Sequence, residues 1–152
     1  MSLVEIVVGL ETSLATIAEA EAFAVQVGKH AIRTKDRAGF VVNFLLVPYL
    51  MAAVGMLQDG FATREDIDAG MRRGCGHPMG PLTLCDLIGL DVLEAVCDSL
   101  YHEFKRPEYA PPALLRRMTA AGHLGRKSGR GFYDYGSERE PARAVAGSSP
   151  PA

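Results

Sequence analysis

The apolar residues of this chain follow two different spacings along its length. Leu3 to Val8 (LVEIVV) and residues 30–35 (HAIRTK) are short runs of strand-forming residues, and each predicts a strand. Between them, apolar residues recur at spacings of three and four behind the N-cap candidates Thr12 and Ser13, which predicts a helix that ends at Gly28. A strand, a helix and a strand in this order form a βαβ unit with parallel strands.

After Asp36 the pattern is helical, and glycine and proline residues divide it. The apolar spacings and stop signals predict helices over residues 36–59, 63–73, 82–88, 91–104 and 113–121. Thr63 and Asp91 are the expected N-caps of the second and fourth of these helices. A turn-rich aromatic segment follows at 122–135. Residues 136–152 have too little apolar content to pack, which predicts a disordered tail.

Composition and charge exclude several classes of function. The net charge is −2 and the basic residues are scattered, so the chain has no basic face for nucleic acid. No apolar run is long enough for a membrane span, and residues 1–10 lack the basic start of a signal peptide. Cys75, Cys85 and Cys97 lack metal-site spacing, so we expect reduced thiols in a cytoplasmic protein without a metal.

Glu5 is the first residue with candidate chemistry. On the strand pattern alone, it is either a solvent-facing side chain of a half-buried strand or a carboxylate that orients a histidine. The histidines of the chain are His30, His77, His102 and His123. None of them is tied to Glu5 by local spacing, so the residues alone assign no acid/base pair.

Asn43 interrupts an apolar helical segment shortly before Pro48. Since Pro48 frees the carbonyl of Phe44, the Asn43 amide either bonds this opened backbone or faces a ligand, and the pattern leaves both open. In the loop GHPMGP, Met79 beside Pro78 is either a core side chain or part of a pocket wall. The sequence contains no G-x-G-x-x-G loop, P-loop, nucleophile elbow or metal-ligand cluster.

Four segments, in this order, resemble one family. They are LVEIV from residue 3, DRAGFVVN with a following PY at 36–49, GCGHPMGPLTLCDLIGLD at 74–91 and LGRKSGRGFYDY at 124–135. Together they resemble the L-3-hydroxyacyl-CoA dehydrogenases, and most of all the bacterial 3-hydroxybutyryl-CoA dehydrogenases. The resemblance covers residues 3–135. It implies a mainly α fold, in which residues 1–36 are a βαβ remnant of a Rossmann-like NAD-binding domain and residues 37–135 are the helical C-terminal domain.

The resemblance also implies roles for individual residues. Glu5 matches the carboxylate that pairs with the family's catalytic histidine, and Asn43 matches the active-site asparagine near the reacting oxygen of the substrate. Pro78 and Met79 match part of the wall of the acyl pocket. The helical domain of the family carries most of the dimer interface and part of the acyl-CoA site.

The chain departs from the family pattern in ways that bear on function. The family's catalytic histidine lies in a His-Phe-Phe-Asn-Pro stretch just upstream of LVEIV. Neither this stretch, the Gly-rich NAD loop nor the substrate-binding serine is present here, and Phe44 and Ala38 replace the usual Arg and Pro. Oxidising a 3-hydroxyl needs a base and a bound nicotinamide. We therefore expect this chain alone to bind no cofactor and to be inactive, while NAD(P) serves the full-length family.

Two hypotheses follow for the function. The first is the C-terminal part of a 3-hydroxybutyryl-CoA dehydrogenase, which interconverts 3-hydroxyacyl-CoA and 3-ketoacyl-CoA in fatty-acid metabolism. It would be present as a fragment, or as one half of a split enzyme with a separate NAD-domain chain. The second is a non-catalytic module that dimerises or binds acyl-CoA. Both predict a homodimer through the helical domain, because apolar stripes lie on several of its faces.

Overall fold

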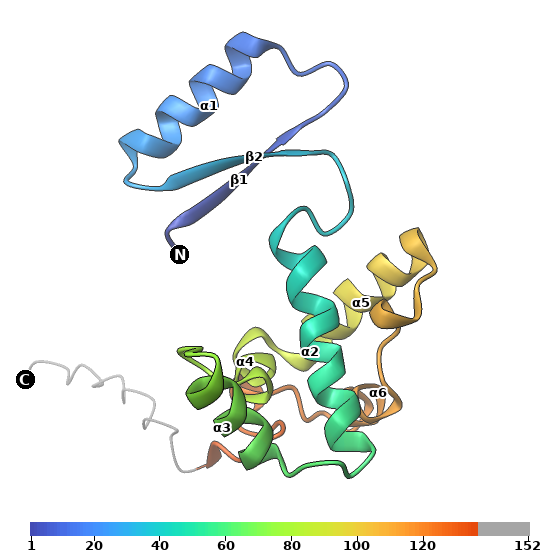
Figure 1. Ribbon diagram of the computed structural model, residues 1–152. Helices are drawn as coiled ribbons and strands as arrows, with labels where there is room; N and C mark the ends of the chain where they lie inside the picture. Colours follow the sequence, from blue (N-terminus) through green and yellow to red (C-terminus); the bar gives the residue numbers. More distant parts are fainter. Residues whose placement is uncertain (137–152) are drawn as a thin grey trace, which may run out of the picture.

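The structure, a computed structural model, describes residues 1–136 and has two parts joined by one connection (Figure 1). The first part is a βαβ unit of β1 (Leu3–Val8), α1 (Leu14–Gln26) and β2 (His30–Lys35). The second is a helical domain of α2 (Val42–Gln58), α3 (Arg64–Gly74), α4 (Pro81–Ile88), α5 (Leu90–Phe104) and α6 (Ala113–Ala120), with short 3-10 helices η1 (Pro107–Tyr109) and η2 (Arg126–Ser128). The mainly α fold expected from the sequence is confirmed.

The predicted disordered tail lies outside the described residues, apart from Gly136. Within residues 1–136, no helix is both long and apolar enough to cross a membrane.

In the βαβ unit, both strands have the bounds that the sequence predicts. β1 and β2 pair in parallel, with Leu3 opposite His30 and Val8 opposite Lys35. α1 packs on one face of this sheet (Figure 1). Among residues 1–136 the sheet has two strands, so each strand keeps one outer edge without a partner strand. Backbone groups on such edges are open to pairing with another strand.

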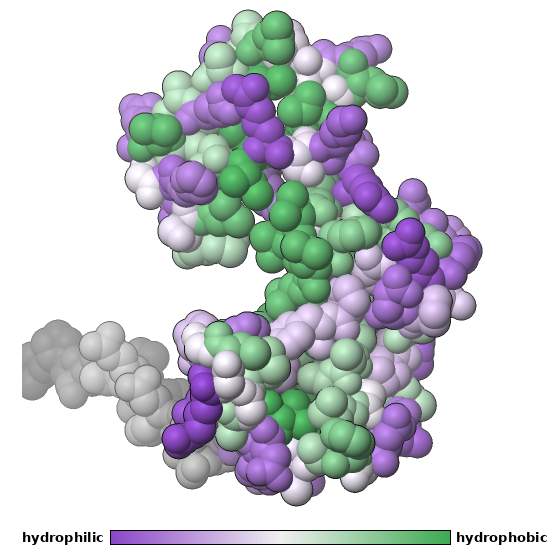
Figure 2. Space-filling view, in the orientation of Figure 1, coloured by the Kyte–Doolittle hydropathy of each residue, from purple (hydrophilic) through white to green (hydrophobic). Residues whose placement is uncertain are grey.

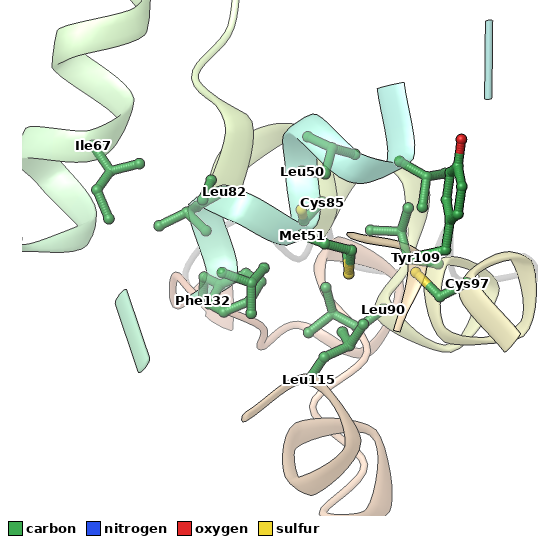
Figure 3. Close-up of a cluster of buried hydrophobic side chains, with 14 of the residues drawn as sticks. Leu50, Met51, Ile67, Leu82, Cys85, Leu90, Cys97, Tyr109, Leu115 and Phe132 are labelled. Carbon is green, nitrogen blue, oxygen red and sulfur yellow. The ribbon is translucent and has the colours of Figure 1, made fainter. Parts of the chain in front are cut away.

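The core lies within the helical domain and draws on its five α-helices and on η1 (Figure 3). Its buried apolar side chains include Leu50, Val54, Ile67, Leu82, Leu90, Leu100, Tyr109, Leu115 and Phe132. Full burial of one such side chain contributes about 1.5–3 kcal/mol. Because every member of the cluster lies between Ala38 and Tyr133, the helical domain has a core of its own that does not depend on the βαβ unit.

α2 begins later than its apolar pattern predicts. The pattern predicts a helix from Asp36, whereas α2 begins at Val42. Gly39 (φ 80°) and Phe40 (φ 45°) have left-handed backbone conformations, which a continuous right-handed helix excludes. A Cβ on Gly39 would lie 2.8 Å from Leu100 Cδ2. The turn before α2 is therefore packed tightly against α5.

Pro48 lies inside α2 and frees the carbonyl of Phe44. That carbonyl accepts the Tyr109 hydroxyl at 3.5 Å. The opened backbone is thus bonded from η1, and Asn43 is not its partner.

The cap predictions hold for α3 and fail for α5. Thr63 caps α3, and its Oγ1 accepts the Asp66 N–H at 3.2 Å. The N-cap of α5 is Gly89, so the prediction that Asp91 caps this helix is wrong. Asp91 lies in the first turn, where its carboxylate accepts a bond from Lys127 Nζ at 2.6 Å. Its charge still favours the helix, because it lies near the positive end of the helix dipole.

Two buried carboxylates fasten the C-terminal segment to α3 and α4. Asp86 is 1% exposed and accepts the N–H groups of Phe132 and Tyr133, each at 2.9 Å, and the Tyr135 hydroxyl at 3.0 Å. Asp68 is 4% exposed and accepts two backbone N–H groups in the first turn of α4 and the Tyr133 hydroxyl at 3.0 Å. This network explains how a segment with little regular structure stays in place.

Candidate functional site

Glu5 reaches from β1 to the first turn of α2. Its Oε1 accepts the N–H groups of Val41 at 2.9 Å and Val42 at 3.2 Å. Val41 is the N-cap of α2 and makes no side-chain cap bond of its own. The Glu5 carboxylate therefore fills the capping role, and its charge lies near the positive end of the helix dipole. Glu5 is half-buried, so it is not simply a solvent-facing strand residue.

Asn43 is the second residue of α2 and lines an open cavity of about 420 Å³. Phe40 lines it from the preceding turn, and Val92, Val96 and Ser99 line it from α5. The Asn43 side chain is exposed and makes no hydrogen bond with any other residue of the described range 1–136. An amide with unused donors and an unused acceptor can bind a ligand in this cavity.

The structure brings Glu5 and Asn43 to one end of one helix, because Glu5 binds the N–H of the residue just before Asn43. Ser99 supplies another polar side chain of the cavity wall, and it is not among the site residues that the sequence predicts. No motif surrounds Ser99, and on α5 its spacing is that of an ordinary surface residue.

Pro78 and Met79 lie elsewhere, in the loop between α3 and α4. Pro78 is exposed, Met79 is half-buried, and neither lines the Asn43 cavity. A second cavity of about 380 Å³ lies between α2 and α3, with apolar walls that include Met56 and Met71. Tyr49 also lines it. The role of Pro78 and Met79 in an acyl pocket stays a prediction.

Phe44, the residue after Asn43, belongs to an aromatic cluster. Its ring centroid lies 5.5 Å from that of Phe104 and 5.7 Å from that of Tyr109. The guanidinium of Arg37 lies 4.4 Å from the Phe44 centroid and 4.8 Å from the Phe104 centroid, which is a cation–π arrangement. An arginine thus lies against position 44 here, although it comes from the connection before α2.

The βαβ unit does not fit the pyrophosphate of a dinucleotide. Such a group needs a Gly-rich turn with free N–H groups at a helix N-terminus. The turn between β1 and α1 has one glycine, Gly9, whose N–H donates to Thr12 Oγ1 at 3.0 Å. At the start of α1, the Thr16 N–H donates to Ser13 Oγ at 3.1 Å. These donors are already bonded within the chain.

The other candidate groups of residues 1–136 are metal ligands and thiols. Across residues 1–136, no group of three or more His, Cys, Asp or Glu side chains could hold a metal ion. Cys85 and Cys97 are buried, and burial raises the pKa of the Cys97 thiol to about 12. Such a thiol stays protonated at neutral pH and is a poor nucleophile.

Known proteins match the chain over both of its parts. Residues 39–135 match the family model described as 3-hydroxyacyl-CoA dehydrogenase, C-terminal domain. The 3-hydroxybutyryl-CoA dehydrogenase of Mycobacterium tuberculosis is 55% identical over 136 residues, which are 89% of this chain and 48% of that protein. The human mitochondrial hydroxyacyl-coenzyme A dehydrogenase is 42% identical over 137 residues, which are 89% of this chain and 43% of that protein.

Solved structures agree with these matches. The crystal structure of FadB2 from Mycobacterium tuberculosis has a TM-score of 0.87 at 55% identity, and that of the (S)-3-hydroxybutyryl-CoA dehydrogenase PaaH1 from Ralstonia eutropha has 0.85 at 52%. Each match covers 89% of this chain and 48% of the other. Fold and sequence thus agree on one family. It belongs to the 3-hydroxyacyl-CoA dehydrogenase family, and it spans about half the length of the bacterial relatives it matches.

Proposed function

We propose that this chain supplies the substrate-facing helical domain of an enzyme that interconverts 3-hydroxybutyryl-CoA and its 3-keto form. The observation that carries the proposal is the free Asn43 amide in a cavity of the very domain that matches the family. NAD(P), which would carry the hydride, would be held outside residues 1–136, because the β1–α1 turn does not fit its pyrophosphate. We propose that the protein acts in the cytoplasm.

Asn43 and Glu5 have different parts in this proposal. The Asn43 amide donates a hydrogen bond to the reacting oxygen of the substrate and so orients it in the cavity. Glu5 uses Oε1 for α2, and its Oε2 makes no hydrogen bond with any other residue of 1–136. That oxygen can accept an imidazole N–H and orient a general base that comes from outside the described residues.

The exposed apolar surface between the βαβ unit and the helical domain supports a nucleotide-binding partner. Figure 2 shows apolar surface where the βαβ unit meets the helical domain. Phe40, Val41 and Val42 are 39–40% exposed, and Leu45 is 68% exposed. Exposed apolar groups that gather in one place mark contact surfaces. We propose that the nucleotide-binding part covers this apolar surface and pairs with a free edge of the β1–β2 sheet.

We also propose a homodimer through the helical domain. The apolar cavity between α2 and α3 supports it, since Met56 at its wall is 40% exposed and Phe61 after α2 is 80% exposed. Sedimentation at micromolar concentration should give a dimer. A clean monomer at these concentrations contradicts this part of the proposal.

An activity assay tests the proposed reaction. The 152-residue chain is mixed with acetoacetyl-CoA and NADH, alone and together with the nucleotide-binding half of the M. tuberculosis relative. We expect no NADH oxidation above the buffer blank from the chain alone, and oxidation from the mixture. Turnover by the chain alone, or a mixture that binds tightly yet stays inactive, contradicts the proposal.

The second candidate is a module that binds acyl-CoA or dimerises without catalysis. The self-contained core and the cavity of the helical domain favour it, because neither depends on the βαβ unit. Calorimetric titration with acetoacetyl-CoA separates the candidates. Micromolar binding by the chain alone, with no gain of activity in the mixture, supports the binding module.

A further inference from the structure

We infer that Glu5 is a positioning residue for Asn43. Through Oε1 it holds the first turn of α2, and thereby it sets where the Asn43 amide stands in the cavity. The inference deepens the proposed function and rests on it for the role of Asn43. It gives Glu5 a task toward a helix of this chain, separate from any task toward an imidazole.

The first turn of α2 depends on this outside acceptor. The Phe44 N–H bonds the Gly39 carbonyl at 3.0 Å, and the Leu45 N–H bonds the Val41 carbonyl at 3.4 Å. The N–H groups of Val41 and Val42 come one turn too early for such partners. Within residues 1–136, Glu5 is the side chain that accepts both.

The connection before α2 packs against α5 at Gly39, but it supplies no acceptor for the N–H groups of Val41 and Val42. Gly39 and Phe40 have positive φ angles of 80° and 45°, and Phe40 in particular adopts a conformation that residues with a Cβ rarely take. Phe40 is also 40% exposed, so little packing holds it. A bond from a rigid element to the helix end therefore acts together with the packing of Gly39 to set where α2 begins.

Glu5 is anchored on such an element. It lies in the middle of β1, opposite Ile32 of β2, and the strand fixes the position of its backbone. One carboxylate oxygen then joins the sheet to the helix end that carries Asn43, and the other stays available to a second donor. The same carboxylate can thus align two groups at one site, the amide on α2 and an imidazole from outside residues 1–136.

Nuclear magnetic resonance of the isotope-labelled full chain tests the bond directly. Glu5→Gln keeps an acceptor oxygen, so the amide signals of Val41 and Val42 should stay close to their wild-type positions. Glu5→Ala removes the acceptor, so both signals should shift together. Glu19→Ala is the matched control, because Glu19 is an exposed carboxylate on α1. This control should leave both signals unchanged.

Glu5→Ala tests the positioning itself. Without an acceptor, amide exchange at Val41 and Val42 should become about five- to tenfold faster, the size expected for a lost cap. The side-chain NH₂ signals of Asn43 should also move in Glu5→Ala and return to their wild-type place in Glu5→Gln.

The inference is overturned if the Val41 and Val42 amide signals stay unchanged in Glu5→Ala, or if the Asn43 side-chain signals stay unchanged in that variant. These measurements need no turnover, so they separate this inference from the proposed reaction. An inactive mixture would contradict the proposed reaction and leave the expected changes of these amide signals unaffected.

Discussion

Asp86→Asn tests whether the buried carboxylates hold the C-terminal segment against α3 and α4. The substitution keeps the shape of the side chain and turns one of its two acceptor oxygens into an NH₂ donor. If the remaining oxygen faces Tyr133 and Tyr135, the new NH₂ faces the buried N–H of Phe132, which then has no partner. Leaving one buried donor unpaired costs about 1–3 kcal/mol.

Two further effects act in opposite directions. The remaining bonds lose their charge assistance and become weaker. Burial, however, raises the pKa of Asp86, because the interior disfavours the charged carboxylate. Removing the charge therefore offsets part of the lost stability. We therefore expect a net loss of about 2 kcal/mol, a large share of a stability of about 5–15 kcal/mol.

Urea unfolding of the full chain, followed by circular dichroism, measures this loss. Asp59→Asn is the matched control, because Asp59 is an exposed aspartate at the end of α2. The control should change the free energy of unfolding by less than about 0.5 kcal/mol. If Asp86→Asn changes it equally little, the carboxylate network does not hold the C-terminal segment in place.

Three further predictions concern stability. Gly131→Ala should destabilise the chain by about 1–3 kcal/mol, because its Cβ would lie 2.0 Å from Asp86 Oδ1. Gly70→Ala is the control, because a Cβ there meets nothing within 4 Å. Equal losses of stability in urea unfolding of the two variants would contradict this prediction. Burial and the neighbouring Asp86 carboxylate raise the pKa of Tyr135 to about 12. Because the folded pKa lies above the unfolded value of about 10, stability should fall as pH rises from about 10 through 12, and by less in Tyr135→Phe; equal falls in both chains would refute this link. Phe44→Leu should lower stability by about 1–2 kcal/mol, since it removes the ring that contacts Arg37, Phe104 and Tyr109; an unchanged melting temperature would show that the cluster contributes nothing.

Local patterns predicted much of the fold. The strands β1 and β2 follow from short runs of strand-forming residues. α3 follows from its N-cap Thr63, whose side chain bonds Asp66 three residues later. In each case the deciding interactions are between residues a few positions apart. Such interactions are visible in the sequence as spacing and residue type.

The misses arise where a distant residue decides. The start of α2 depends on Glu5, which is far away in the sequence, and on two left-handed residues that the apolar pattern hides. The roles of Asp68 and Asp86 depend on Tyr133, which reaches both of them from the C-terminal segment. Asn43 was left open between two interpretations, and Tyr109 decides the backbone half of that question by bonding the Phe44 carbonyl. Contacts of this kind follow from packing and leave no local signature.

The most direct test of the central claim uses a chimera that joins the nucleotide-binding half of the M. tuberculosis relative to this chain. The claim is that this chain supplies the substrate side of the site through Asn43. Asn43→Ala should then lower kcat for acetoacetyl-CoA reduction by about 10²-fold, the size found when one positioned donor to a reacting oxygen is removed. Ser99→Ala, at the wall of the same cavity, should have a smaller effect. A chimera in which Asn43→Ala keeps full kcat would contradict the account.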